Sequence, residues 1–262
     1  MASTRLRLLS EERRREILKL LERHKRVTVE GLSERFQVSA VTIRTDLERL
    51  AAEGFLVRSH GGAIPSLSPQ TDYPLQVKKT LHRAEKVRIG RAAARLIQPH
   101  QTVILDSGTT TVEVARAIKQ THTSALTVIT HALTIAQELL DASNISLIMI
   151  GGVLRHVSGS FVGPQAERMM SELNADHFFL AVDGLDPGAG PSTPDVLEAQ
   201  LNAVMMRMAR QVTVVADASK FGRRSLSVIG DIRSVHRIIT DDRIPGEIAG
   251  KLRGLGIEVM IV

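Results

Sequence analysis

The sequence contains no cysteine, no tryptophan and a single tyrosine in 262 residues. The absence of cysteine excludes disulfide bonds, thiolate metal sites and a cysteine nucleophile. The nine histidines are scattered, so they form no local cluster with the spacing of a metal site. The GxSxG sequence of serine hydrolases is also absent. We therefore expect no metal, no cofactor and no catalytic residue.

Long apolar runs are missing as well. No stretch of about 18 apolar residues is present, so no membrane span or membrane partner is expected. Residues 1–26 hold many arginines and no long apolar stretch, unlike a secretory signal peptide, and a cytoplasmic location is expected. Because aromatic residues make up 3% of the chain and hydrophobic residues 43%, aliphatic side chains must fill a sizeable core.

Positive charge is distributed unevenly along the chain. Residues 1–65 contain 13 Lys and Arg against 9 Asp and Glu, and the remaining residues contain 21 against 19, out of totals of 34 and 28. Most of the excess of +6 therefore lies in the first quarter of the chain. Such a basic segment favours a polyanionic partner for the N-terminal part, although many small basic domains bind none.

The N-terminal pattern predicts three helices and a β-wing. Residues 10–24 and 30–36 have apolar side chains at helical spacing, with a short β-branched segment at 27–29 between them. Ser39 is placed to cap a third helix that runs from Ala40 and ends at Gly54. Residues 55–63 then predict a strand and a turn. This order is that of a winged helix-turn-helix, which we assign to residues 1–63.

The third helix is expected to enter the major groove of double-stranded DNA. An arginine there can form two hydrogen bonds to guanine, and hydroxyls can contact phosphates. The candidate DNA contacts are Ser39, Ala40, Thr42, Arg44, Thr45 and Arg49 on the helix, with Arg58 and His60 on the wing. Arg13, Arg14 and Arg15 can add phosphate contacts from the first helix. The same pattern also fits a three-helix module that binds protein.

The remainder of the chain has a different pattern. Residues 64–78 contain three prolines and several polar residues, which predicts a linker. From residue 79 to 262, apolar β-branched runs alternate with helical segments, which predicts an α/β domain with a mostly parallel sheet. The predicted strands are 102–106, 126–130, 146–151, 177–182, 212–217, 236–240 and 258–262. The predicted helices are 83–97, 132–140, 164–173, 195–210 and 245–253.

The stretch DSGTTT, residues 106–111, ends the first of these strands and opens a helix. Gly108 lets the backbone approach a ligand, hydroxyls follow, and a helix N-terminus offers free N–H groups, so a phosphate is the expected occupant. Without a lysine or GxxxxGK[ST] it is not a nucleotide P-loop. A plain strand–turn–helix with Ser and Thr caps is the alternative.

Several other strands also end in polar or glycine residues, which a parallel sheet gathers along one crevice. These are Gly151-Gly152, Asp183-Gly184 and Asp217–Lys220. Lys220 can balance an anion, and Asp183 and Glu198 can bind sugar hydroxyls. Helix capping and surface ion pairs are the alternatives for each.

Residues 14–63 resemble the DNA-binding domain of the DeoR family of bacterial transcription regulators. The matching pieces are Val38-Ser39, Thr42-Ile43-Arg44, Asp46-Leu47, Leu50, Gly54 and His60-Gly61-Gly62-Ala63. Two positions depart from the family pattern. Gln37 stands where a glycine is common in the turn, and Thr45 stands where a basic or amide residue is common, which affects the base preference.

Residues 76–262 resemble the effector domain of the same family, which is similar to sugar-phosphate isomerases and deaminases. The runs ILDSGTTT, Ser192-Thr193 and 198–205 are most similar to its AgaR-like amino-sugar regulators. The resemblance implies a phosphorylated sugar on the 107–111 loop, with Asp183, Glu198 and Lys220 around the sugar. The implied effector contacts are Asp106, Ser107, Gly108, Thr109, Thr110, Thr111, His131, Gly151, Gly152, Asp183, Gly184, Glu198 and Lys220. His131 stands where the family usually has asparagine, and it can hydrogen-bond a ligand or lie at the surface.

Together these features predict a DNA-binding regulator, by family expectation a repressor of a carbohydrate catabolism operon that a sugar phosphate releases. A homo-oligomer, dimer or tetramer, is expected because paired half-sites multiply specificity. The chief alternative is a sugar-phosphate isomerase or deaminase, since a carboxylate base and an anion clamp suit that chemistry. A scaffold that binds protein through the three-helix module is a further alternative.

Overall fold

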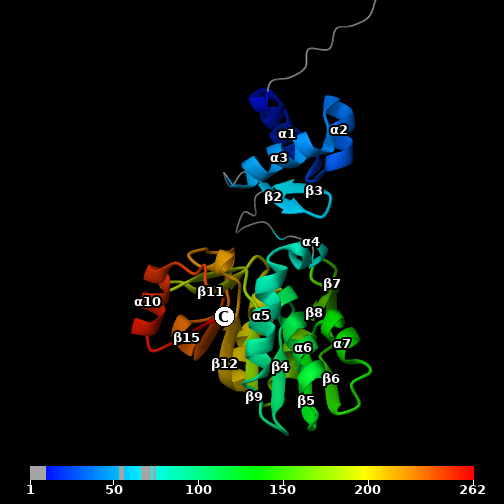
Figure 1. Ribbon diagram of the computed structural model, residues 1–262. Coiled ribbons are helices and arrows are strands. Elements are labelled where there is room, and N and C mark those ends of the chain that lie inside the picture. The colour runs from blue at the N-terminus through cyan, green and yellow to red at the C-terminus, as the bar shows by residue number, and fades with distance from the viewer. Residues whose placement is uncertain (1–9, 53–55, 66–71, 73–74) are drawn as a thin grey trace, which may run out of the picture. The chain divides into compact units, whose positions relative to one another are not determined.

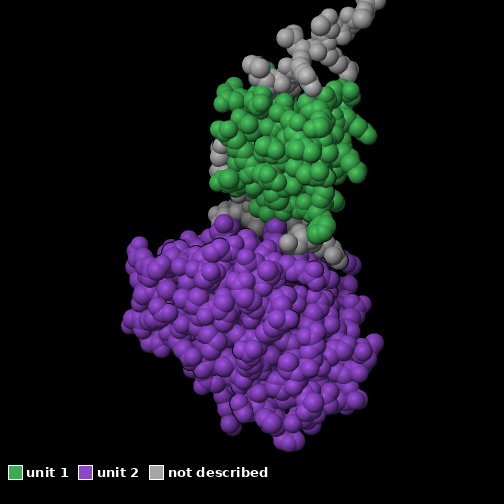
Figure 2. All heavy atoms as spheres, viewed as in Figure 1, with its two compact units in different colours: residues 1–68 green, residues 69–262 purple. Residues whose placement is uncertain are grey.

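The computed structural model describes residues 10–52, 56–65, 72 and 75–262. The chain divides into two compact units, residues 1–68 and residues 69–262 (Figure 1, Figure 2). Gly54, which the sequence places at the end of the third helix, lies outside the described residues. Each unit has its own apolar core.

Unit 1 is a winged helix-turn-helix, as the sequence predicts. Its elements in chain order are α1 (Ser10–His24), β1 (Val27–Thr28), α2 (Val29–Phe36), α3 (Ala40–Ala52), β2 (Leu56–Ser59) and β3 (Gly62–Pro65). The strands form an antiparallel sheet in the order β1-β3-β2, so the wing hairpin is joined to the short strand before α2. Ile17, Ile43 and Leu47 are fully buried between the helices.

Local hydrogen bonds fix the starts of α2 and α3 and the turn between them. Thr28 caps α2 by accepting a hydrogen bond from the Gly31 N–H at 3.1 Å, and Ser39 caps α3 by accepting one from the Thr42 N–H at 3.2 Å. Gln37 lies between the helices in the left-handed region, with φ of 51°. That conformation explains why glycine suits this position. Its side-chain amide donates to the Glu34 carbonyl at 2.7 Å, a local contact that helps hold the turn.

A buried ion pair joins α1 to α3. The Arg13 Nε lies 2.5 Å from Asp46 Oδ2, and both side chains are buried, while Arg14 Nη1 lies 3.5 Å from Asp46 Oδ1. The expectation that Arg13 contacts DNA phosphates is therefore wrong. Its guanidinium faces the core side of α3 because Asp46 shares that side with Ile43 and Leu47.

Unit 2 is built on a seven-stranded sheet in the order β15-β14-β12-β9-β4-β5-β6, and all its pairings are parallel (Figure 1). This confirms the predicted mostly parallel α/β domain. The strands are β4 (Thr102–Leu105), β5 (Leu126–Thr130), β6 (Ile145–Met149), β9 (Ala175–Leu180), β12 (Ala209–Val215), β14 (Arg237–Thr240) and β15 (Glu258–Ile261). Their side chains alternate between two cores, one on each face of the sheet.

Helices cover both faces of this sheet. One face packs on α5 (Arg83–Ala94), α6 (Thr109–Thr121) and α7 (Leu133–Leu139), and the other on α8 (Pro164–Ser171), α9 (Val196–Met208) and α10 (Gly246–Gly254). Phe179 points to the first face and Phe178 to the second, and both are fully buried. Burial on both faces explains why these strands read as nearly continuous apolar runs.

Smaller elements that the sequence pattern did not indicate lie around the sheet. These are the hairpin β7 (Val153–Arg155) and β8 (Ser160–Val162), the three-stranded sheet of β10 (Gly184–Asp186), β11 (Gly190–Thr193) and β13 (Ser227–Val228), and the short helices α4 (Leu75–Thr80), η1 (Ala218–Lys220) and η2 (Ile232–Ser234). The segment expected to be a linker, 64–78, thus begins inside β3 and ends inside α4.

The buried pair in unit 1 predicts a large effect of one substitution. Asp46→Asn is expected to lower the free energy of unfolding by about 3 kcal/mol, because the Arg13 guanidinium stays buried without a counter-charge. Glu48→Gln removes a carboxylate from the exposed side of the same helix and is expected to change it by less than about 0.5 kcal/mol. Denaturant unfolding followed by circular dichroism measures both. Equal costs for the two variants would contradict a structural role for the pair.

Candidate functional site

The strand order reverses direction between β4 and β9. From β4 the chain proceeds to β5 and β6 on one side, whereas β9 leads to β12, β14 and β15 on the other. The loops that follow β4 and β9 therefore leave the sheet side by side, and the Asp106 N–H donates to the Phe179 carbonyl at 3.2 Å. In open α/β sheets, ligands bind at such a switch point, beyond the carboxyl ends of the strands. The predicted phosphate loop and Asp183-Gly184 are these two loops.

Asp106 connects both loops to the surrounding elements. Its Oδ1 accepts hydrogen bonds from the Ser107 N–H at 2.7 Å and from His131 Nε2 at 3.1 Å. Its Oδ2 accepts from the Ala181 N–H at 3.0 Å and from Asn202 Nδ2 at 3.2 Å. Burial raises the pKa of Asp106, and the hydrogen bond from His131 opposes that rise. The carboxylate is only 1% exposed, so it organises the site and is not itself presented to a ligand.

His131 is also fully buried, and both ring nitrogens are engaged. Its Nδ1 lies 2.8 Å from the Phe161 carbonyl, which can only accept, so Nδ1 carries a proton. Its Nε2 lies 3.1 Å from Asp106 Oδ1 and also 3.1 Å from the Ser107 nitrogen. Burial lowers the pKa of His131, but the hydrogen bond and negative charge of Asp106 raise it more. The structure thus gives His131 the task of holding the loop, in place of the expected ligand contact.

The phosphate loop leaves the start of α6 open. Gly108 precedes the helix, and a Cβ at this position would lie 2.6 Å from the Ala181 Cβ, so the approach of the second loop requires glycine. No described residue accepts a hydrogen bond from the N–H groups of Gly108, Thr109, Thr110 or Thr111. The Thr111 hydroxyl donates instead to the Asp106 and Gly108 carbonyls, at 2.7 and 2.9 Å. Thr111 therefore contributes to the shape of the loop through its side chain.

Helix α9 supplies two polar side chains to the loop. Glu198 and Asn202 are four residues apart, so they share one face of the helix, and both are buried. Glu198 Oε1 lies 3.5 Å from the Ser107 hydroxyl and its Oε2 accepts from the Thr193 hydroxyl at 3.2 Å. The sequence interpretation did not identify Asn202 as a site residue, although two polar residues four positions apart in an apolar helix were a detectable signal.

Asp183 lies between two lysines on the other side of the switch point. Its Oδ1 is 2.9 Å from Lys78 Nζ and 3.4 Å from Lys220 Nζ. Burial raises the pKa of Asp183, but the two ammonium groups lower it more, so the net shift is downward. The structure therefore brings Asp183 and Lys220 together, and it adds Lys78, which lies in the segment expected to be a linker.

Lys86 is a third lysine near this carboxylate, and it is almost completely buried. Its Nζ donates to the Lys78 and Leu81 carbonyls, both at 2.7 Å, and so satisfies carbonyls at the C-terminal end of α4. Burial lowers the pKa of Lys86 to about 8; Asp217 opposes this shift and Lys220 adds to it. The sequence contained no signal for this role, because it depends on where α4 docks.

Arg155 is the main cation that the sequence interpretation missed. It stands on β7 and contacts four side chains: Asp72, Asp195 at 3.0 Å, Ser158 at 2.9 Å and Glu198 at 3.4 Å. The β7–β8 hairpin also brings the Ser160 hydroxyl to 3.4 Å from Glu198. Glu198 Oε1 is thus a common neighbour of Arg155 and Ser107.

The predicted glycines shape the surroundings of the site. Gly152 has φ of 152°, and a Cβ there would lie 2.7 Å from the Val162 carbonyl, so it belongs to the turn that leads into the β7–β8 hairpin with Gly151. Gly184 pairs with Ser192 in the small sheet. Within the part of the chain that the structure describes, neither Gly151 nor Gly152 hydrogen-bonds to the 106–111 loop. They immediately precede β7, the strand that carries Arg155.

The exposed face of α3 differs from the expected one by one residue. Ala40 packs against the core of unit 1, because it precedes buried Ile43 by three residues. Val41 takes its place on the outside and is 67% exposed, on the same face as Arg44 and Thr45. A strict helical count from Ile43 could have found this. Ser39 and Thr42 bond to each other through their hydroxyls at 2.9 Å.

The remaining DNA-contact candidates lie around this face. Arg44 is exposed, and no described residue pairs with its guanidinium. Arg58 of the wing donates to the Arg44 carbonyl at 3.4 Å, which links β2 to α3. His60, at the wing turn, and Arg49 are exposed. The outward face of α3 thus presents a methyl-bearing residue, a hydroxyl and an unpaired arginine.

Two family models match the chain. Residues 13–68 match the DeoR-like helix-turn-helix domain, and residues 81–242 match the DeoR C terminal sensor domain. The chain belongs to the DeoR family of transcriptional regulators. The family places it with DNA-binding regulators and not with the isomerase or deaminase class that the sequence left open.

Relatives across nearly the whole length agree with this DeoR-family assignment. A protein of Escherichia coli O157:H7 named for repression of the aga operon is 42% identical over 96% of this chain and 93% of its own. The regulator GlpR of Haloferax volcanii is 34% identical over 97% and 98%. The glycerol-3-phosphate regulon repressor of Escherichia coli K12 is 33% identical over 88% and 90%.

Solved structures give weaker similarity. Ribose 5-phosphate isomerase A of Methanocaldococcus jannaschii aligns with a TM-score of 0.39 at 15% identity, over 52% of this chain and 53% of that one. A similarity of this size supports no functional conclusion. Within the described ranges, no helix is long and apolar enough to span a bilayer, and no group of three or more His, Asp or Glu is arranged to hold a metal ion.

The buried amine of Lys86 predicts a pH dependence of stability. Between the folded pKa of about 8 and the ordinary value of 10.5, the unfolded chain binds the proton that the folded chain has lost. Stability from this group therefore rises with pH across that window, by up to about 1.4 kcal/mol per pH unit, and is level below it. Denaturant unfolding of the wild type and Lys86→Met at several pH values measures the difference. A difference that stays constant from pH 8 to about 10 would refute the shift.

Proposed function

We propose that this DeoR-family regulator represses a carbohydrate catabolism operon and releases it when a phosphorylated sugar binds at the switch point of unit 2. The open N-terminus of α6, beside Asp183, Lys220 and Glu198, is the observation that carries the proposal. Backbone N–H groups and a helix dipole favour an anion, and neighbouring carboxylates favour sugar hydroxyls. The names of two relatives, for the aga operon and for the glycerol-3-phosphate regulon, support a carbohydrate signal.

In this proposal the phosphate lies against the N–H groups of Gly108, Thr109 and Thr110, with the Ser107 hydroxyl at its side. Lys220 supplies positive charge, and Asp183 and Glu198 accept hydrogen bonds from sugar hydroxyls. Asp106, His131 and Thr111 hold the loop in shape without touching the ligand. Loss of any of these three is then expected to weaken binding indirectly.

For DNA recognition we propose that α3 lies in the major groove with Arg44 directed to a guanine or a phosphate. Thr45 and Val41 lie on the same exposed face, where a methyl group can contact thymine. Arg58 and His60 of the wing reach the backbone or minor groove. One such unit reads few base pairs, so a homo-oligomer, a dimer or tetramer, supplies paired half-sites.

The exposed arginine on α3 provides the test of DNA binding. The DNA is a fragment that the wild-type protein selects from a random pool. Arg44→Ala is expected to weaken binding to this fragment by roughly tenfold or more, since one base contact contributes about 1–3 kcal/mol. Gel-shift titration at fixed salt measures the affinity. Arg91→Ala removes the same charge from an exposed position in unit 2 and is expected to bind normally. Equal affinity of the two variants would exclude Arg44 from the interface.

The first residue of α6 provides the test of the effector site. Thr109→Asp places a carboxylate at the helix N-terminus, where it suits the helix dipole but repels a phosphate. Thermal unfolding against a panel of sugar phosphates is expected to show stabilisation of the wild type, about 2.7 kcal/mol at a hundredfold excess over Kd, and none of this variant. Thr109→Ser keeps the hydroxyl and is expected to respond normally. Full stabilisation of Thr109→Asp would move the phosphate elsewhere.

A further inference from the structure

Asp72 belongs to unit 2 and follows the unit boundary at Ser68 by a few residues. Its carboxylate forms an ion pair with Arg155 and lies 3.5 Å from Lys78 Nζ. Both cations also contact residues of the effector site, because Arg155 reaches Glu198 and Lys78 reaches Asp183. The carboxylate of Asp72 therefore occupies an anion position at the edge of that site, between an arginine and a lysine.

Arg155 lies within reach of the phosphate loop. Its Nη1 is 3.4 Å from Glu198 Oε1, and the Ser107 hydroxyl is 3.5 Å from the same oxygen. An arginine binds phosphate and carboxylate in the same two-pronged geometry. A phosphate on the loop thus competes with Asp72 for Arg155.

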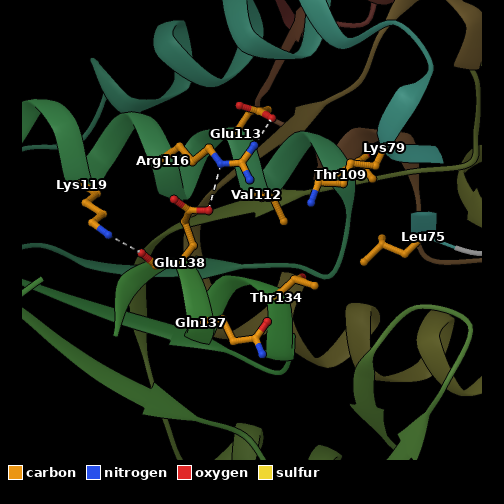
Figure 3. A pocket seen from close by; sticks show the side chains of 10 residues that line it. All are labelled: Leu75, Lys79, Thr109, Val112, Glu113, Arg116, Lys119, Thr134, Gln137 and Glu138. Carbon is orange, nitrogen blue, oxygen red and sulfur yellow. Dashed lines mark hydrogen bonds and ion pairs between the residues drawn. The ribbon is translucent and has the colours of Figure 1, made fainter. Parts of the chain in front are cut away.

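The segment that Asp72 precedes makes several polar contacts with the rest of unit 2. The Leu75 N–H donates to the Val157 carbonyl at 3.0 Å, Lys78 pairs with Asp183, and Lys86 holds the carbonyls at the helix end. Leu75 and Lys79 border a cavity of about 230 Å³ against α6 and α7. Figure 3 shows these two residues on one side of the cavity, with Val112, Thr134 and Gln137 on the other.

Helix α4 borders this cavity with two of its described side chains. No described residue pairs with the Lys79 ammonium, and the Leu75 side chain is only partly buried. A short helix held by exchangeable ion pairs is displaced more easily than one held by a packed apolar face. Lys78 on α4 contacts Asp183, and Asp72, just before the helix, contacts Arg155. Both partners border the proposed effector site.

We propose that Asp72 is an internal anion that fills part of the effector's phosphate position, and that the incoming phosphate takes over Arg155 and releases Asp72 together with α4. This inference rests on the proposed effector function. Because α4 is the first described element after the unit boundary, its release changes how the DNA-binding unit is tethered. Arg155 thus both binds the ligand and, by losing Asp72, reports its arrival.

The test uses the full chain with two probes, inorganic phosphate and glycerol 3-phosphate, titrated calorimetrically at constant ionic strength. Asp72→Asn is expected to bind the probes about tenfold more tightly than the wild type, since the competing carboxylate is gone. Glu258→Gln is the matched control, because it likewise removes the carboxylate partner of an arginine, Arg237. Glu258 lies on β15 at one edge of the seven-stranded sheet, whereas Arg155 follows β6 at the other edge. It is expected to bind like the wild type.

Amide hydrogen exchange in α4 separates displacement from a general change of charge. In the wild type, either probe is expected to speed exchange of the Leu75 amide and the residues after it. In Asp72→Asn these amides are expected to exchange fast already, with little further change. Tighter binding together with this pattern supports the proposal.

The opposite results have distinct meanings. Probe binding that leaves exchange in α4 unchanged, or equal affinity of the wild type and Asp72→Asn, overturns the role of Asp72 while the effector site stands. If neither protein binds either probe, the inference fails. If the wider panel of sugar phosphates also leaves wild-type stability unchanged, the proposed effector fails with it.

Discussion

The buried carboxylate of Asp106 joins the two loops on which the site depends. It accepts hydrogen bonds from the Ser107 and Ala181 N–H groups, which belong to the loops after β4 and β9, and from His131 and Asn202. Each donor comes from a different part of unit 2, so one side chain sets their spacing. A carboxylate without these donors could not remain charged in so buried a place.

His131 makes that arrangement particular to this chain. Its Nδ1 donates to the Phe161 carbonyl, and its Nε2 lies 3.1 Å from Asp106 Oδ1. Each side chain shifts the pKa of the other, so the two titrate as a coupled pair rather than as independent groups. The Ser107 N–H lies 2.7 Å from Asp106 Oδ1 and 3.1 Å from His131 Nε2, so the phosphate loop is anchored to both side chains.

Around this rigid centre the charges are paired but exchangeable. Arg155, Lys78 and Lys220 all have carboxylate partners, and a sugar phosphate offers both an anion for the cations and hydroxyls for the carboxylates. Binding can therefore replace internal pairs with ligand pairs without leaving a buried charge alone. In the proposed effector site, specificity then depends on whether the ligand carries both kinds of group, and the proposed displacement of Asp72 provides the signal.

Unit 1 illustrates the same division between a fixed frame and an exposed face. The Arg13–Asp46 pair and the caps at Thr28 and Ser39 fix the angle between the helices. Arg44, in contrast, has no described partner and remains available. The left-handed Gln37 shows that this frame is retained even where the turn lacks glycine.

The local sequence pattern predicts much of the secondary structure and the candidate anion loop. The periodicities predict the helices of unit 1 and the seven strands of unit 2, because apolar spacing of about 3.6 or continuous β-branched runs act within a few residues. DSGTTT predicts an anion loop for the same local reason. The pairing of Asp183 with Lys220 also follows from parallel strands ending at one edge.

Only the tertiary structure decided which polar groups are free and which are used internally. Lys78, Lys86 and Arg155 enter the site from a presumed linker, a helix and a hairpin, and His131 turns inward to Asp106. Arg13, expected at DNA, lies against Asp46, which is 33 residues away. Such contacts form only when elements far apart in the sequence pack together, so local sequence spacing does not predict them.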